Sequence, residues 1–366
     1  MKLVPDFDGV PGFVPRGYGL PALLDSCGYL VVPVFLYMLF KVSTNAWRSD
    51  ATARTIGQRL LDIFAYFEDQ NISFGSVTVS NLSEYRDFKL REGIDGKPCS
   101  EASVNLALNA FQTYWHWALK ERLIVESAAV SIEDYYVRTT GLPAFAAMRL
   151  PTGEEIVEFS RCLRGPEQHI ANKLSFSTGL RRAEIVSLPA DILLPIDSME
   201  QRRGAVLLRL DGYHAPTKGN RPRTVEVPRR LYGEMLNYKI SDRRARRIER
   251  SGQESTLLVT KYGHPCRPDW LNDVFASASK LSGIDIHPHL NRHYYATRFL
   301  EHETPSRFKG NEYAALMELQ RLLGHAHLQT TMGYTHVAVA EHDKKTHALT
   351  GYQQVIDEII RNCGYA

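Results

Sequence analysis

Hydrophobic positions recur with a helical period along roughly the first 140 residues. Residues 51–70 carry an apolar stripe along a single helix face, formed by Ile56, Leu60, Ile63, Phe64 and Phe67. Further helices are predicted at residues 79–92 and 100–123, and Ser100 can serve as the N-cap of the second. This part of the chain is therefore expected to form a small all-helical bundle.

Two segments near the start depart from this pattern. Residues 29–40, "YLVVPVFLYMLF", are almost wholly apolar, but the run is too short to cross a bilayer and Pro33 interrupts it. We expect a buried helix there. Residues 1–28 are rich in Pro and Gly, which predicts an irregular N-terminal arm.

The second part of the chain mixes helices with strands. A connector rich in Pro, Gly and aromatic residues covers residues 135–151, and Thr152 can cap the helix that follows. Residues 204–216 and 223–228 flank the turn "TKGNRP" and predict an antiparallel hairpin. Residues 255–260, "STLLVT", are expected to form a third strand.

These patterns divide the chain into an arm at 1–28, a helical domain at 29–145 and a second domain at 146–366. The predicted fold is mainly α with a small antiparallel sheet, and the sheet makes the second domain α+β. An amphipathic helix is predicted near the C-terminus at 348–362, with Val355, Ile356, Ile359 and Ile360 together.

Composition narrows the class of protein without identifying a partner. A chain of 366 residues is long for one core, so two domains are expected. Apolar residues make up 44% and charged residues 23%, as in an ordinary globular protein. The net charge is +3 and the sequence pI is about 8.5, too mildly basic to predict nucleic-acid binding by itself.

Five scattered cysteines without CxxC spacing predict reduced thiols, not a disulfide framework or a zinc knuckle. The apolar run follows no basic leader, so no signal peptide is expected. We expect a cytoplasmic protein without a membrane partner.

The densest positive run is "RRARRIER" at 243–250. Arg243, Arg244 and Arg247 are candidates for contacts to a phosphate backbone. A solvated helix face is the alternative.

A second concentration of charge, "HPHLNRHYYATRFL" at 287–300, adds histidines to arginines. On a helix His289, Arg292 and His293 share one face. The HxxxH pair could bind zinc, but the metalloprotease motif has Glu directly after the first His. Leu290 stands there, and no carboxylate nearby completes a ligand set, so no metal site is predicted.

Three other segments carry weaker signals. In "STGLRRAEIVSL" (177–188), Thr178 and Gly179 can start a helix with Arg181 in its first turn and Glu184 one turn on. A cation in a first turn opposes the helix dipole, which is explained if it binds an anion together with the exposed N–H groups. Lys218 stands at the tip of the predicted hairpin.

The last segment is "LLGHAHLQTTMGYTH" at 322–336. Gly324 is predicted to end a helix, His325 follows it, and Tyr334 comes nine residues after His325. One tyrosine among 18 is no signal by itself.

Taken in order, the four segments resemble the catalytic domain of the tyrosine recombinase (phage integrase) family. The family pattern is an Arg in a "TGLRxxE" helix, a Lys on a β-hairpin, "HxLRH", "LGH" and "TTxxYxH". The resemblance covers roughly residues 150–340, and residues 50–123 look like the family's helical core-binding domain. The matching positions are Arg181, Lys218, His289, Arg292, His325 and Tyr334.

The resemblance implies a two-domain DNA clamp that breaks and rejoins DNA strands without a metal or other cofactor. Arg181 and Arg292 would clamp the scissile phosphate, and His325 would donate a further hydrogen bond to it. Tyr334 would be the nucleophile of a covalent 3′-phosphotyrosyl intermediate, and Lys218 would protonate the leaving oxygen.

His289 would assist removal of the tyrosine proton, and Glu184 and His293 would orient the cations. The implied partners are double-stranded DNA and a tetramer assembled on two DNA sites, with exchange of the C-terminal helix between subunits and accessory proteins where direction is controlled. The implied role is integration or transposition of a mobile element. Two features depart from the pattern: Asn291 replaces Leu, and residues 301–314 lengthen the stretch before "LGH".

Three other classes of protein are alternatives to a recombinase. A type IB topoisomerase shares the chemistry but relaxes DNA without exchange. A DNA-binding regulator of the same fold would not need Lys218, His289 and Tyr334 together. A metal-dependent hydrolase would be inactivated by a chelator.

Overall fold

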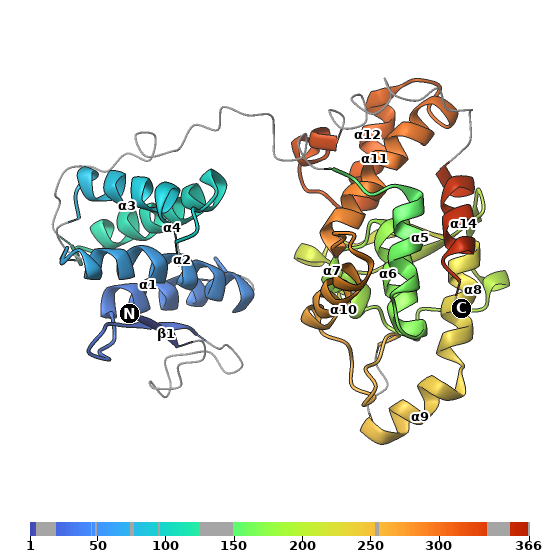
Figure 1. Cartoon of the computed structure of the whole chain (residues 1–366), viewed down its shortest axis with the longest axis horizontal. Helices are drawn as coiled ribbons and strands as arrows, with labels where there is room; N and C mark the ends of the chain where they lie inside the picture. The colour runs from blue at the N-terminus through green and yellow to red at the C-terminus, as the bar shows by residue number, and fades with distance from the viewer. Residues whose placement is uncertain are drawn as a thin grey trace. The chain divides into compact units, whose positions relative to one another are not determined.

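The computed structural model describes residues 1–4, 20–44, 46–47, 50–73, 77–93, 96–124, 149–252, 256–334 and 352–364 (Figure 1). The chain divides into two compact units, Met1–Gly141 and Leu142–Ala366. The predicted domain boundary at 145/146 lies outside the described residues and stays a prediction. In the described ranges, none of the helices has the length and apolar character that a bilayer crossing requires.

The first unit is built mainly of helices, namely α1 (Val32–Ser43), α2 (Asp50–Asp69), α3 (Val79–Arg91) and α4 (Glu101–Lys120). The predicted stripe of α2 is confirmed, because Leu60, Ile63, Phe64 and Phe67 are fully buried. Ser100 caps α4 as expected, with its side chain accepting from the N–H of Ser103. Tyr37, Phe111, Tyr114 and Trp115 complete an aromatic core.

The prediction for the apolar run at 29–40 is confirmed in its main point. Val34, Phe35, Tyr37 and Met38 of α1 are buried. Pro33 does not interrupt the helix. It stands in the first turn, where its missing N–H would have no intrahelical partner in any case.

The prediction that residues 1–28 form a wholly irregular arm is wrong, whereas the helical prediction for the residues after it is confirmed. β1 (Lys2–Val4) and β2 (Ala22–Leu24) pair antiparallel, with Leu3 opposite Leu23. Ala22 and Leu23 are fully buried in the core of the helices, and the Met1 amino group pairs with Glu68 at 2.9 Å. The apolar side chains of β1 and β2 therefore add to the core of the helices, and their burial stabilises the pairing of the two strands.

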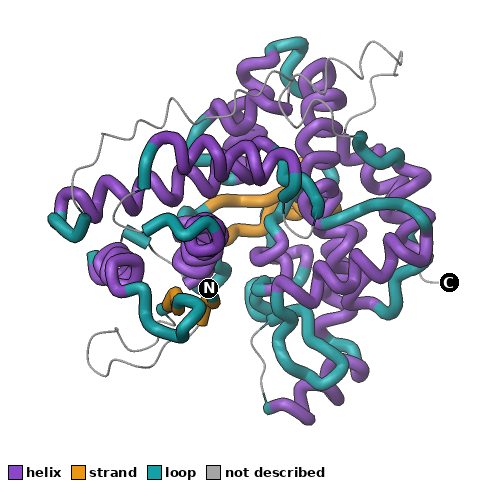
Figure 2. Tube along the Cα trace, turned by 60° about the vertical axis from the view of Figure 1, so that its left-hand side comes forward, coloured by secondary structure: helices purple, strands orange, loops and turns teal. Residues whose placement is uncertain are grey.

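The second unit surrounds a small sheet with helices (Figure 2). Its helices before the sheet are α5 (Gly153–Arg161), α6 (Pro166–Thr178) and α7 (Arg182–Val186). Those after the sheet are α8 (Arg229–Lys239), α9 (Asp242–Ser251), α10 (Pro268–Ser282), α11 (Pro288–Ser306), α12 (Glu312–Leu323) and α14 (Tyr352–Asn362). Nearly all of α6 is buried, and it packs against α8, α11 and the sheet.

The predicted hairpin is confirmed: β4 (Ala205–Leu210) pairs antiparallel with β5 (Arg223–Pro228). The third strand was predicted in the wrong place. It is β3 (Gln201–Arg202), which pairs with the other edge of β4. Residues 256–260 form only isolated bridges, and the Arg244 side chain binds the carbonyl oxygens of Thr256 and Leu257.

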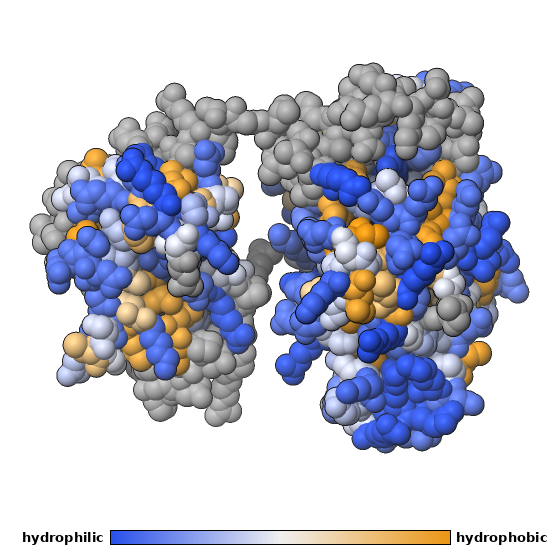
Figure 3. Space-filling model, viewed as in Figure 1, coloured by the Kyte–Doolittle hydropathy of each residue, from blue (hydrophilic) through white to orange (hydrophobic). Residues whose placement is uncertain are grey.

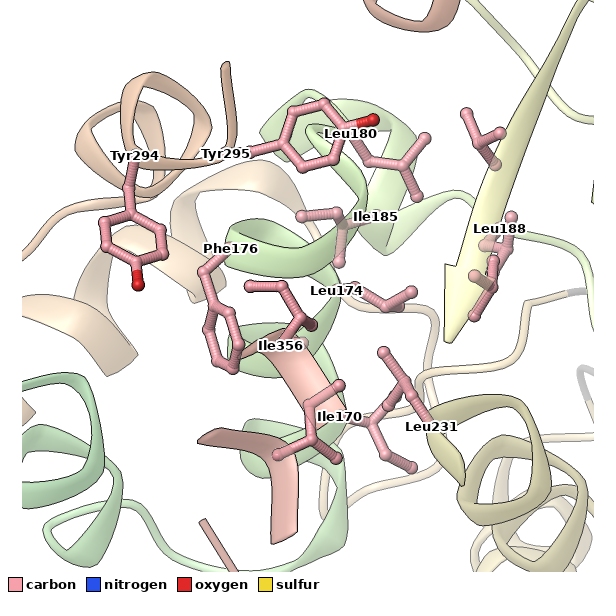
Figure 4. Packing of buried hydrophobic residues seen from close by; sticks show 14 of the residues in the cluster. Ile170, Leu174, Phe176, Leu180, Ile185, Leu188, Leu231, Tyr294, Tyr295 and Ile356 are labelled. Carbon is pink, nitrogen blue, oxygen red and sulfur yellow. The ribbon is translucent and has the colours of Figure 1, made fainter. Parts of the chain in front are cut away.

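The C-terminal helix α14 packs on its own unit. Ile356 and Ile360 are fully buried, and Ile356 lies beside Phe176 of α6 (Figure 4). Glu303 accepts the N–H of Tyr352 at 3.0 Å. Here the helix completes the core of the chain to which it belongs, and its exchange with a neighbouring subunit stays a prediction.

Candidate active site

One pocket in the second unit gathers all the residues predicted to be catalytic. Its lining includes Arg181, Lys218, His289, Arg292, His325 and Tyr334, together with His293. They come from five segments: the start of α7, the turn between β4 and β5, α11, the turn after α12, and the helical residues 328–334. Segments more than 150 residues apart in the sequence thus meet at one place.

Arg181 does not stand where the sequence placed it. Thr178 ends α6, and Gly179 takes the left-handed conformation (φ +64°) that caps the helix. A Cβ at Gly179 would lie 2.4 Å from the Tyr295 ring. The prediction that Thr178 and Gly179 start a helix is therefore wrong, and Arg181 is the N-cap of α7 and not a residue of its first turn.

Glu184 fixes the position of Arg181 through hydrogen bonds. Its carboxylate accepts the Arg181 backbone N–H at 2.7 Å and Nη1 at 3.1 Å. Arg181 Nη2 donates to the carbonyl of Gly324 at 3.2 Å. The predicted orienting role of Glu184 is consistent with these contacts.

A second arginine, Arg223, shares this carboxylate and was missed by the sequence analysis. Its Nη1 and Nη2 donate to the two oxygens of Glu184 at 3.0 and 2.5 Å. Burial would raise the pKa of Glu184, but Arg223 and then Arg181 outweigh it, and the pKa is lowered. A signal existed in "RTVEVP", where Arg223 shares the strand face of Val225 and Val227 and so points inward.

Arg292 is buried in α11 and held by backbone carbonyls. Its guanidinium donates to Gly179 and to Leu323, the latter at 2.9 Å. Burial, followed by repulsion from Arg181, lowers the pKa of Arg292 to about 10. The group remains charged at neutral pH.

His325 is neutral, and its tautomer follows from its partners. Arg292 Nη2 lies 3.0 Å from His325 Nε2, and a guanidinium can only donate, so Nε2 accepts. The proton is then on Nδ1, which donates to Thr331 Oγ1 at 3.0 Å. Burial, then the charges of Arg292 and Arg181, lowers the pKa of His325 to about 3. Donation to a phosphate requires a proton on Nε2, hence a change of tautomer or protonation.

Tyr334 lies inside the pocket of its own chain. Its ring stacks on His325, with centroids 6.2 Å apart, and tilts against His293 at 5.3 Å. Burial raises the pKa of the Tyr334 phenol, while the charge of Arg292, a hydrogen bond from it and the charge of Arg181 oppose the rise. The lengthened stretch at 301–314 extends α11 and begins α12, and Tyr334 still reaches the pocket.

The remaining residues predicted for the site, His289, His293 and Lys218, also line the pocket. The rings of His289 and His293 contact edge to face at 4.3 Å. Burial and neighbouring cations lower the pKa of His289, and burial followed by His289 lowers that of His293 to about 4. Within the described part of the chain, no group of three or more His, Cys, Asp or Glu side chains is arranged to hold a metal ion. Lys218 is exposed on the turn between the strands.

The arginine run in α9 is mostly structural. Arg244 is buried and donates to three backbone carbonyls, so its predicted contact with DNA is wrong. Arg247 pairs with the buried Glu167 of α6, and Arg243 joins the same carboxylate at 3.0 Å. Arg243 keeps half of its side chain exposed, and the surface over α9 is hydrophilic (Figure 3).

A basic groove adjoins the catalytic pocket, and the sequence analysis did not identify it. Lys218 and His325 line both spaces. Besides Lys218, the exposed cations of the groove come from β3, the β3–β4 turn, β4, the hairpin turn and α12, and they are Arg202, Arg203, Arg209, Arg221 and Arg321.

The chain matches models of known domains over both units. Residues 154–341 match the phage integrase family and residues 36–132 match the phage integrase SAM-like domain. Tyrosine recombinase XerC 2 of Ralstonia nicotianae is 27% identical over 334 residues, which cover 89% of this chain and 88% of that protein. Tyrosine recombinase XerC of Mycobacterium bovis is 28% identical over 305 residues, covering 80% and 90%.

Solved structures share the fold. The site-specific recombinase XerH in its post-cleavage complex aligns with a TM-score of 0.56 at 17% identity, covering 85% of this chain and 83% of that one. A lambda integrase dimer on a core site aligns with a TM-score of 0.57 at 13% identity, covering 87% and 80%. The phage integrase family model matches more than half of this chain. The chain therefore belongs to the phage integrase family, and it is a tyrosine site-specific recombinase.

Proposed function

We propose that this protein cleaves and rejoins DNA strands at specific sites through a covalent 3′-phosphotyrosyl intermediate on Tyr334, without a metal ion. The supporting observation is that Arg181, Arg292 and Tyr334 converge on one pocket. Two guanidiniums can stabilise the charge that builds up on the non-bridging phosphate oxygens, which a metal ion does in many phosphoryl-transfer sites.

In the proposed reaction, the Tyr334 oxygen attacks the scissile phosphorus and the bond from phosphorus to the 5′ oxygen breaks. Lys218, exposed on its turn, gives a proton to the departing 5′ oxygen. His289 takes the phenol proton, directly or through His293, whose ring contacts Tyr334. Both imidazoles have lowered pKa values and are therefore neutral proton acceptors at pH 7.

Rejoining reverses these steps. A 5′ hydroxyl attacks the phosphotyrosine, and Tyr334 leaves. Because the covalent bond conserves the energy of the broken linkage, no nucleotide cofactor is needed. Attack by the hydroxyl of a second duplex makes the reaction an exchange.

We propose that the DNA backbone leaves the pocket along the basic groove, in contact with Arg202, Arg209 and Arg221. These cations are exposed and continue from the catalytic pocket through Lys218. Arg243 is a secondary candidate. The XerH and lambda integrase structures with similar folds are complexes with DNA sites.

Exchange between two duplexes cuts four strands, and each protomer supplies one tyrosine. We therefore propose a tetramer on two sites, associated with the nucleoid. We also propose that the reaction serves a mobile element, as a Tn1549 transposon integrase shares this fold with a TM-score of 0.56.

The test traps the intermediate on DNA of unknown sequence. The protein is incubated with nicked suicide duplexes of randomised sequence, and covalent adducts are recovered on a denaturing gel and sequenced. We expect adducts that share one sequence, persist in chelator and vanish in Tyr334→Phe. Adducts that survive this substitution, or their loss in chelator, contradict the proposal.

The same DNA distinguishes a topoisomerase. A recombinase joins two duplexes that carry the recovered site. A supercoiled plasmid relaxed without any exchanged product identifies a type IB topoisomerase instead.

A further inference from the structure

We propose that Arg223 is a positioning residue of the phosphate clamp: it neutralises Glu184, so that the charge of Arg181 is left for the scissile phosphate. This inference rests on the proposed cleavage reaction. Arg223 does not line the catalytic pocket, although its almost buried side chain forms part of the wall of the adjoining basic groove, and it acts on the pocket through its contacts with the residues that line it.

The contacts around Glu184 define the arrangement. Each carboxylate oxygen accepts one hydrogen bond from Arg181 and one from Arg223. The side chains of Glu184 and Arg223 are 4% and 5% exposed, whereas that of Arg181 is 24% exposed. The buried arginine occupies the fork on the carboxylate, and the partly exposed one binds it with a single guanidinium nitrogen.

The balance of charges in this cluster determines how much positive charge Arg181 can offer to a phosphate. Arg181, Arg223 and Glu184 together carry one net positive charge beside the pocket. Without Arg223, Glu184 would be a buried carboxylate whose ion pair is with Arg181. A buried unpaired charge is strongly unfavourable, so the guanidinium of Arg181 would be drawn onto Glu184 and the net charge of the pair would be zero.

Arg223 also supports the turn that carries His325. Gly324 caps α12 with φ +63°, and a Cβ there would lie 2.6 Å from Arg223 Nη1. The carbonyl of Gly324 accepts from Arg181. Since Arg223 begins β5, five residues after Lys218, one buried side chain joins the hairpin, the start of α7 and the turn before His325.

The alternative is that Arg223 has a purely structural role and stabilises the packing of β5 against α7 and the turn at Gly324. The two roles differ in how the defect depends on the charge of the DNA. A methylphosphonate at the scissile position replaces one charged oxygen by a methyl group, and a neutral linkage needs less cationic stabilisation. A loss of available charge on Arg181 should therefore slow cleavage of the phosphate more than cleavage of the methylphosphonate.

The experiment measures single-turnover cleavage of the trapped DNA site with either linkage. We expect Arg223→Met to cleave the phosphate roughly 10- to 100-fold more slowly, as is typical when a group that orients a reactive residue is lost. The defect should shrink on the methylphosphonate. Arg229→Gln, at an exposed arginine next to the end of the same strand, is the matched control and should cleave both linkages normally.

A second variant keeps the test valid if Arg223→Met folds poorly. Combined with Glu184→Gln, the same change removes the charge and its counter-charge together, and the double variant should cleave the phosphate faster than Arg223→Met alone. If Arg223→Met does not fold, Arg223→Lys, which retains the charge without the fork, is compared with wild type, and its defect should likewise be larger on the phosphate than on the methylphosphonate.

Equal loss on both linkages, or a wild-type rate on the phosphate, would overturn the inference. Adduct formation by the wild type and its loss in Tyr334→Phe establish the cleavage reaction independently of Arg223. A failure of the proposed function is thereby distinguished from a failure of this role.

Discussion

The second unit contains two clusters of the same composition, each with one buried glutamate between two arginines. At the pocket, Glu184 binds Arg181 and Arg223, and under α9, Glu167 binds Arg243 and Arg247. Next to each cluster a further buried arginine donates to backbone carbonyls, Arg292 at the pocket and Arg244 in α9. The first cluster opens onto a pocket that also holds a tyrosine.

The densest run of charge in the sequence is thus not the one that lines the pocket. The α9 run is the densest in the chain, yet its arginines mainly join α9 to α6 and to residues 256–259. At the pocket, the arginines are spread over more than 100 residues of sequence. There the carboxylate of Glu184 and backbone carbonyls fix the guanidiniums of Arg181 and Arg292 beside a pocket with room for an anion.

The largest expected contrast comes from replacing the carbonyl-bound arginine in each cluster by lysine. Arg292→Lys should slow cleavage of the trapped site by roughly 10²- to 10³-fold, because an ammonium cannot keep the carbonyl contacts and donate to a phosphate in the same geometry. Arg244→Lys should leave the rate of the folded protein unchanged. Single-turnover cleavage and urea unfolding, measured on both variants, check this.

The expected cost of Arg244→Lys is a loss of stability of about 2–4 kcal/mol, since buried carbonyls lose their donors. A cleavage defect in a stably folded Arg244→Lys protein would mean that α9 has a direct part in the reaction, and the distinction between the clusters would be lost.

The next contrast removes the charge of each shared carboxylate. Glu184→Gln should slow cleavage by about 10-fold or more, because Arg181 loses the group that orients it. Glu167→Gln should lower the free energy of unfolding by about 1–3 kcal/mol with no change in the cleavage rate. The same cleavage and urea assays apply. Equal effects of the two substitutions on cleavage would contradict the assignment.

Much of the pocket could be predicted because its residues sit in recognisable local motifs. Tyr334, Arg292 and His325 each occupy a short pattern with a fixed spacing, and the hairpin that carries Lys218 follows from alternating apolar positions and a turn. These features are local, so the sequence carries them without knowledge of the tertiary structure.

The errors concern contacts that depend on distant partners. Burial of Arg244 depends on residues 256 and 257, and the role of Arg223 depends on Glu184, 39 residues earlier. β3 has only two residues, too few for a periodic signal. The apolar stripe of α14 indicates burial but not the surface that buries it, so the packing of this helix on α5 and α11 did not follow from the sequence.

A smaller effect is expected from acid, since the pocket also holds neutral histidines. His325 and His293 have pKa values of about 3 and 4, below the value of about 6.5 for an unfolded histidine. The unfolded state therefore binds more protons below pH 6.5, and stability should fall as the pH drops from 6.5 toward 4. His169 of α6, whose pKa burial also lowers, acts in the same direction.

Urea midpoints between pH 8 and pH 5 check this, with His325→Gln and His293→Gln compared with wild type. Each variant removes one group that titrates only on unfolding, so the pH dependence should become shallower. An unchanged slope in both variants would mean that these imidazoles are already protonated in the folded protein.

The smallest effect is expected where α11 meets α6 through neutral groups. Asn291, which replaces the family's leucine beside Arg292, is fully buried and donates to Asn172 Oδ1 at 3.1 Å and to Ser175 Oγ at 2.6 Å. Asn291→Leu removes these donors but restores an apolar side chain of similar size, so the loss should be only about 1 kcal/mol. Asn291→Ala is the matched control, and it should cost about 1 kcal/mol more because it leaves a cavity.

Cleavage by both variants should stay near the wild-type rate, since the contacts that hold Arg292 come from Gly179 and Leu323. Urea unfolding and single-turnover cleavage again provide the measurements. A large cleavage defect in Asn291→Leu would show that neutral bonds on the far side of α11 orient the guanidinium as strongly as charges do. The comparison between the two clusters would then have to include the packing of the helix that carries each arginine.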